Sequence, residues 1–154
     1  MSDYQRLTRV CALAELPAPL AQALWQRAQD QGIQNLGQEA LIVCETTSTK
    51  IKRSGLIHRL LGGDPDKMHI TGIVVTPKQI IWGHHGEKRG TAVLSAKFSE
   101  VRITAFASTL VADTGLEVSG FISGFNEKAQ AFIGLGEGAA ADQLRQLIAQ
   151  VTGE

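Results

Sequence analysis

The chain has 154 residues, of which 44% are hydrophobic and 19% charged, and its 15 Lys and Arg balance its 15 Asp and Glu. This length supports one hydrophobic core, and the composition excludes a disordered or fibrous chain. The lack of net charge argues against a whole-surface nucleic-acid binder, which would carry a broad basic excess. No apolar run approaches the ~20 residues of a membrane span and the N-terminus is too polar for a secretory signal, so we expect a cytoplasmic protein.

The first 36 residues are predicted to form a helical appendage. Apolar residues at spacings of three and four predict a first helix over residues 4–15: Tyr4, Leu7, Val10, Cys11 and Ala14. Pro17 and Pro19 interrupt this pattern, and a second helical stripe runs over residues 18–31 until Gly32. We therefore divide the chain into an N-terminal helical appendage, residues 1–36, and a second unit, residues 37–154.

After Gly37 the chain is rich in β-branched residues and in alternating apolar positions, which are typical of strands. Pro77 occupies the second position of a predicted turn, where proline is favoured. The β-rich segments on either side of this turn are therefore predicted to form a hairpin. The seven predicted strands cover residues 41–47, 70–76, 79–84, 91–98, 101–112, 116–122 and 129–135. The period then changes once more, and Leu144, Leu147, Ile148 and Val151 predict a helix over residues 138–152.

Seven short antiparallel strands, divided into about four and three, bury their apolar faces only when the two sheets pack or curl together. The open end of such a barrel needs a plug, and the amphipathic C-terminal helix suits this role. We therefore expect a mainly β (α+β) fold, a barrel of two antiparallel sheets with a C-terminal capping helix and the N-terminal helical appendage packed outside it.

This order of elements resembles the pleckstrin-homology superfold. The stretch Gly72-Ile73-Val74-Val75-Thr76-Pro77-Lys78-Gln79-Ile80-Ile81-Trp82 is similar to a hairpin of bacterial pleckstrin-homology-like (PH-like) and GRAM-like domains. Residues 113–118 resemble a later hairpin of these domains, and residues 131–134 with the Ala-rich helix resemble their last strand and cap. The resemblance covers residues 38–152 and implies a PH-like barrel, which serves as a platform for lipids, peptides and other domains alike.

Residues 48–67 carry the clearest local excess of positive charge, with five basic residues against Asp64 and Asp66. In the PH domains that this chain resembles, the first long loop is where anionic headgroups are commonly met. Anionic lipid attracts each basic residue by about 1 kcal/mol, while apolar neighbours enter the interface. The candidate anion- or lipid-binding residues are Lys50, Lys52, Arg53 and Arg59.

The apolar residues of the same segment allow two further interpretations. Leu56, Ile57, Leu60 and Leu61 have helical spacing, so they form either a short helix packed on the barrel or, if uncovered, a surface for another protein. Trp25 is the residue by which the second N-terminal helix contacts the barrel or a neighbour, with a plain core role as the alternative. These five residues are the candidate interface residues.

Two histidines are predicted to lie on one face of the hairpin. With Pro77 and Lys78 at its centre, paired residue numbers sum to 155, so His84 lies diagonally from His69. Apart from Glu87, no third ligand stands nearby in the sequence, whereas zinc sites have three or four protein ligands. We therefore expect solvated histidines at a strand end and no metal site.

The sequence has no motif of catalysis or of a bound cofactor. It contains no GxSxG, HExxH, Walker or CxxC motif. Gly134, Gly136 and Gly138 precede a helix but lack the spacing of a dinucleotide site, and we interpret them as a sharp turn into that helix. Cys11 and Cys44 form no ligand pair, so we expect buried, reduced and unreactive thiols.

The leading hypothesis is a non-enzymatic interaction or scaffolding module of PH-like fold, which binds protein partners or associates with itself and requires no cofactor or nucleic acid. The alternative is a protein peripheral to the membrane that binds anionic-lipid headgroups through the basic segment 50–59. An enzyme whose Ser, His and Asp residues meet only in space is the third hypothesis.

Overall fold

The structure is a computed structural model that describes residues 4–51, 66–106 and 114–153. These residues form eight strands, three α-helices and one short 3-10 helix, η1. In chain order the elements are β1 (Tyr4–Val10), η1 (Leu13–Glu15), α1 (Ala18–Asp30), α2 (Leu36–Glu39), β2 (Ile42–Lys50), β3 (Met68–Val75), β4 (Gln79–Gly86), β5 (Gly90–Lys97), β6 (Val101–Phe106), β7 (Gly115–Gly120), β8 (Ala129–Gly134) and α4 (Ala139–Thr152).

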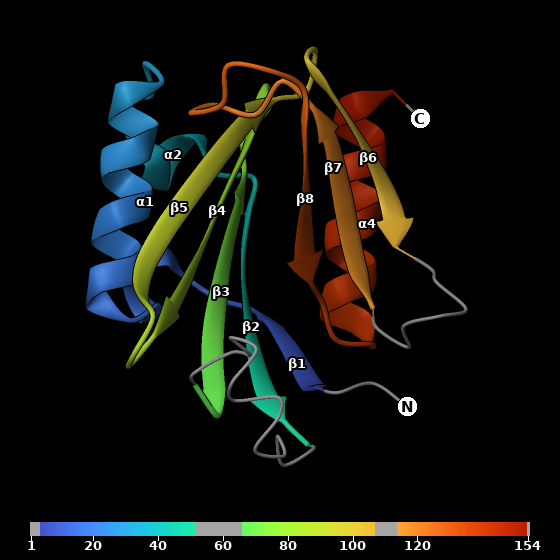
Figure 1. The fold of residues 1–154 in the computed structure, drawn as a ribbon. Helices are drawn as coiled ribbons and strands as arrows, with labels where there is room; N and C mark the ends of the chain where they lie inside the picture. Colours follow the sequence, from blue (N-terminus) through green and yellow to red (C-terminus); the bar gives the residue numbers. More distant parts are fainter. Residues whose placement is uncertain (1–3, 52–65, 107–113, 154) are drawn as a thin grey trace.

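The strands form two antiparallel sheets, one in the order β1-β2-β3-β4-β5 and one in the order β6-β7-β8. In Figure 1, α1 lies beside β4 and β5 of the larger sheet, and α4 lies on the other side of the molecule, behind the smaller sheet. A mainly β fold with two antiparallel sheets and a C-terminal helix was predicted, and this much is confirmed. Within the described residues, no strand pairing joins the two sheets into a closed barrel.

The helix predicted over residues 4–15 is wrong, because residues 4–10 form the edge strand β1 of the larger sheet. Arg6 lies opposite Ser48 of β2, and Thr8 lies opposite Thr46. The apolar spacing fitted a helix, but alternate residues also suit a strand. Short isolated helices are only marginally stable, whereas β2 offers this segment backbone hydrogen-bond partners along its whole length. The larger sheet therefore has five strands instead of the four that we predicted, while the second predicted helix is confirmed as α1.

The hairpin around Pro77 is confirmed with its predicted register, since Ile70 pairs with His85 and Ile73 with Trp82. Residues 73–75 and 80–82 are completely buried on both faces of the sheet. A continuous apolar run is what such a strand requires, because one face packs against the interior and the other against α1. The central position of β3 and β4 thus follows from this pattern.

The main core lies between the two sheets and α4. Trp82 is its largest fully buried side chain, and Leu144 and Ile148 of α4 pack into the same cluster. The sheets contribute Ile42, Cys44, Ile73, Val75, Ile80, Ala96, Ile103, Leu116, Val118 and Ile133. The amphipathic C-terminal helix therefore covers apolar residues of both sheets, as its single apolar stripe predicted.

A second core lies between α1 and the outer face of the larger sheet. Leu20 and Leu24 of α1 are fully buried against Val74 and Ile81. Gly72 and Gly83 allow the leucine side chains of α1 and of the residues just before it to lie close to the sheet. A Cβ at either position would lie within 3.2 Å of one of these leucine side chains. The N-terminal segment is thus built into the sheet by β1 and packed on it by α1.

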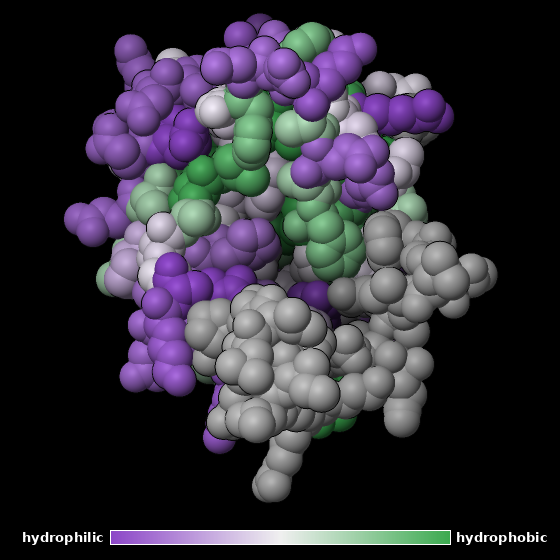
Figure 2. Space-filling view, in the orientation of Figure 1, coloured by the Kyte–Doolittle hydropathy of each residue, from purple (hydrophilic) through white to green (hydrophobic). Residues whose placement is uncertain are grey.

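The apolar margins of both sheets reach the surface on one side of the molecule. Figure 2 shows hydrophobic residues gathered in the middle of this view, over β5 and β8, with hydrophilic residues above and to the left. Val93 and Leu94 of β5 and Ala131 of β8 are only partly buried and pack against the two cores. These three side chains therefore belong to the margins of the two cores.

Candidate functional site

Most of the predicted binding residues lie outside the described residues. Lys52, Arg53 and Arg59 of the basic segment belong to this group, as do the apolar residues Leu56, Ile57, Leu60 and Leu61. Lys50 is described as the last residue of β2, where it is half-buried and pairs with Tyr4. The lipid-binding hypothesis therefore stays a prediction.

Trp25 is half-buried on α1 and packs against the second core. Its ring also lies near Gly37, at 4.0 Å from the position that a Cβ would take there. Trp25 thus contacts its own chain on the outer face of the larger sheet. This contact fits the core role that we gave as the alternative to a binding role.

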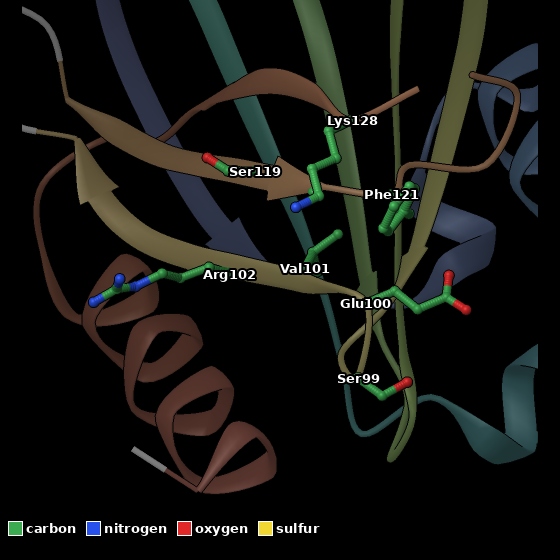
Figure 3. A pocket seen from close by; sticks show the side chains of 8 residues that line it. Ser99, Glu100, Val101, Arg102, Ser119, Phe121 and Lys128 are labelled. Atoms are coloured by element: carbon green, nitrogen blue, oxygen red, sulfur yellow. The ribbon is translucent and has the colours of Figure 1, made fainter. Parts of the chain in front are cut away.

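The clearest pocket in the described residues lies on the smaller sheet and has a volume of about 850 Å³. We call it the Phe121 pocket. It is lined by Ser99, Glu100, Val101, Arg102, Ser119, Gly120, Phe121 and Lys128, which come from the start of β6, the end of β7 and the residue before β8 (Figure 3). Arg102 and Ser119 alternate with the inward-facing Ile103 and Val118, so they lie on the face of the sheet that is turned away from the main core. Val101 packs against the main core and forms the inner side of the pocket.

Gly120 shapes this pocket. Its φ of +133° lies in the region that glycine tolerates best, and a Cβ there would lie 2.4 Å from the carbonyl oxygen of Glu100. The next residue, Phe121, donates its backbone N–H to the same carbonyl at 3.0 Å. The end of β7 is thereby held against the start of β6, and the Phe121 side chain stays 48% exposed.

Charged side chains surround the Phe121 ring. The ammonium of Lys128 lies 5.7 Å from the ring centroid, within the range of a cation–π contact. In Figure 3 the ring lies between the Lys128 ammonium and the Glu100 carboxylate. Within the part of the chain that the structure describes, Glu100, Arg102 and Lys128 form no ion pair. The pocket thus combines a partly exposed aromatic ring, a cation that contacts it, and two further charges, Glu100 and Arg102, without an ion pair among the described residues.

The two hairpin histidines meet on the inner face of the larger sheet. Their ring centroids are 6.1 Å apart, so the predicted diagonal relationship is confirmed. The expectation of solvated histidines is wrong, because His69 is only 7% exposed and Nδ1 of His84 lies 2.9 Å from Oγ1 of Thr71. Burial lowers the pKa of His84 from 6.5 to about 4, and electrostatic interactions with His69, Arg89 and Arg6 act in the same direction.

The polar half of this inner face also holds Arg6. Its guanidinium lies 4.8 Å from the centroid of the Tyr4 ring and 5.5 Å from that of Phe132, and it donates a hydrogen bond to Ser48. Arg6 therefore connects β1 and β2 to the edge strand of the smaller sheet. This cluster is a polar extension of the interior that orients β1.

Asp66 is a buried carboxylate that organises the turn between β4 and β5. It is 5% exposed, accepts hydrogen bonds from the backbone N–H groups of Lys88 and Arg89, and pairs with the Arg89 guanidinium. Gly86 makes room for it, since a Cβ there would lie 2.3 Å from its carboxylate oxygen. A pocket of about 620 Å³ borders these residues. The sequence marked Asp66 only as an acidic neighbour of the basic segment.

The described residues offer no metal centre. Within residues 4–51, 66–106 and 114–153, no group of three His, Cys, Asp or Glu side chains is placed to hold a metal ion. Both cysteines are free, and burial raises the pKa of the Cys44 thiol to about 12 and also raises that of Cys11. None of the described helices has the length and apolar character that a membrane crossing needs.

Sequence reasoning did not find the Phe121 pocket. It placed Phe121 in a strand and Lys128 in a turn, on either side of a hairpin between β7 and β8. The only signal was the alternation that puts Arg102, Ser119 and Phe121 on the outward face. A pocket formed by three chain segments requires the register of the sheet, which a single sequence does not determine.

Comparison of the chain with family models, with curated proteins and with solved structures gave no match. The PH-like resemblance therefore rests on the order of elements and on the hydrophobic pattern. The functional argument rests on the geometry of the described residues.

Proposed function

We propose that this chain is a non-enzymatic interaction module of PH-like architecture that binds a protein partner through the Phe121 pocket. The support for the PH-like architecture is the order of two antiparallel sheets followed by a C-terminal helix that packs on both. The support for binding is one observation, the exposed Phe121 ring inside a pocket whose flanking charges form no ion pair among the described residues.

The chemistry of the pocket favours binding over catalysis. Its polar groups are two serine hydroxyls, a carboxylate, a guanidinium and an ammonium, and none of its lining residues is a histidine or a cysteine. A serine needs a base in hydrogen-bond contact to become a nucleophile, and among the described residues neither Ser99 nor Ser119 makes a hydrogen bond to Glu100 or Lys128. The partly exposed aromatic ring and the arginine, by contrast, are residue types enriched in the energetically dominant part of protein interfaces.

Site-specific photo-crosslinking tests this function. A benzophenone amino acid is placed at Arg102, in the pocket, and in a control chain at Gln26, which is exposed on α1. After irradiation with a lysate of the source cells, we expect a discrete adduct from the Arg102 position only, and its loss when Phe121→Ala is added. Equal adducts from both positions, or none from either, would contradict the proposal.

A further inference from the structure

The solvent face of the smaller sheet carries a balanced set of charges. Glu100 and Glu117 are negative, Arg102 and Lys128 are positive, and two minus two leaves no net charge on this face. Among the described residues, none of the four takes part in an ion pair. A polyanion such as nucleic acid or an anionic membrane prefers an excess of positive charge, so this face does not suit it.

The strand register arranges these groups symmetrically about β7. Phe121 lies at the end of β7, Glu100 precedes β6 on one side and Lys128 precedes β8 on the other. Neighbouring strands are about 4.8 Å apart, so the acidic and the basic residue stand on the order of 10 Å apart with the ring between them. The surface around Phe121 thus has one negative and one positive flank.

We propose that the partner bound at the Phe121 pocket is a second copy of this chain, an inference that rests on the proposed function. A two-fold axis along β7 places the Phe121 ring against the Phe121 ring of the second copy. The same rotation exchanges the two flanks, so each Glu100 meets the Lys128 of the other copy. One contact is therefore made twice, as an isologous interface requires.

The remaining charges are compatible with this arrangement. Glu117 lies on β7 near the axis, so the two copies bring their Glu117 side chains toward each other. Arg102 lies diagonally beside Glu117 on the neighbouring strand of the same copy and offsets this repulsion. A face made of three short strands buries less area than most permanent dimers, so we expect a weak association that depends on concentration.

Charge reversal tests the dimer by sedimentation equilibrium at low salt over a wide range of protein concentration. The unchanged chain should shift from monomer toward dimer as its concentration rises. Glu100→Lys and Lys128→Glu should each raise the dimer Kd by roughly ten-fold, because each places two like-charged pairs at the interface. The matched controls Glu137→Lys and Lys78→Glu reverse exposed charges elsewhere and should leave the Kd unchanged.

Mixing the two charge-reversal variants gives the decisive result. An equimolar mixture of Glu100→Lys and Lys128→Glu chains restores both opposite-charge pairs, as does the double variant alone, so both should recover the original Kd. A chain that stays monomeric at every concentration, or variants that fail to rescue each other, would overturn the dimer. If the Arg102 adduct with another protein persists in that case, the proposed function stands without self-association, and if it is also absent, both fail.

Discussion

The backbone N–H of Gly136 donates a hydrogen bond to Oγ1 of Thr8, 2.8 Å away, across 128 positions of sequence. The same hydroxyl lies 2.8 Å from Oγ1 of Thr46 on the neighbouring strand. Thr8 therefore joins the edge strand β1 to β2 on one side and to the connection between β8 and α4 on the other. This link ties the edge of the larger sheet to the segment that follows the smaller sheet.

Gly136→Ala should destabilise the protein by about 1–3 kcal/mol. A Cβ at this position would lie 2.5 Å from the carbonyl oxygen of Arg6 and 3.1 Å from the backbone nitrogen of Thr8, so β1 would have to move away. The midpoint of urea denaturation measures the loss. The neighbouring Glu137→Ala changes an exposed side chain and should stay within about 0.5 kcal/mol of the unchanged protein. Equal stability of the two variants would contradict this close contact.

Alanine at Gly83 should cost more stability than alanine at Gly72. A Cβ on Gly83 would lie 2.7 Å from Val93 and 2.9 Å from the backbone oxygen of Ala92, and backbone cannot give way easily. A Cβ on Gly72 would meet only the tips of leucine side chains at 3.1 to 3.2 Å, and these can shift. Thermal unfolding of both variants in one buffer gives the order. A lower melting temperature for Gly72→Ala would reverse the interpretation.

Stability should fall as the pH drops from about 6.5 to about 4, partly through His84. The pKa of His84 is lowered to about 4 in the folded chain, so between these values the unfolded chain binds the proton and the folded chain does not. The full loss is about 3 kcal/mol. Denaturant melts at several pH values should show a smaller slope in His84→Gln than in the unchanged protein. Parallel slopes would show that the imidazole does not titrate in this way.

The two thiols should differ in accessibility under native conditions. Burial raises the pKa of Cys44 to about 12, and its side chain is fully buried, whereas Cys11 is only half-buried. A thiol reagent at mildly alkaline pH should therefore modify Cys11 slowly and Cys44 only after denaturation. Mass spectrometry counts the modified sites, and Cys11→Ser should leave no reactive thiol in the native protein. Rapid modification of Cys44 in that variant would argue against its buried position.

Several features of this protein followed from local patterns in the sequence. The hairpin around Pro77, with Ile70 opposite His85, was predictable because a turn residue fixes the register of the strands beside it. The helix α4 was predictable because Leu144 and Ile148 recur at its period. The diagonal placement of His69 and His84 followed from the same register.

The course of residues 4–10 was decided by the tertiary structure. The spacing of Tyr4, Leu7 and Val10 fits one face of a helix, but the alternation of residues in the same segment also fits a strand. The local pattern alone therefore did not distinguish a helix from a strand. The edge of β2 settles the matter because it offers hydrogen-bond partners to every second residue of β1. β2 is distant from β1 in the sequence, so a pattern of neighbouring residues cannot reveal that the two strands pair.

The sequence by itself determined where the strands after β1, the turn at Pro77 and the C-terminal helix lie, because these depend on residues close together along the chain. Only the tertiary structure decided the burial of Asp66 and the convergence of Glu100, Phe121 and Lys128 on one face. Both features arise where segments that are distant in the sequence lie side by side. Which segments do so depends on the register of the sheets and on glycines that leave room for a close contact, as Gly120 does for the Glu100 carbonyl and Gly86 for the Asp66 carboxylate.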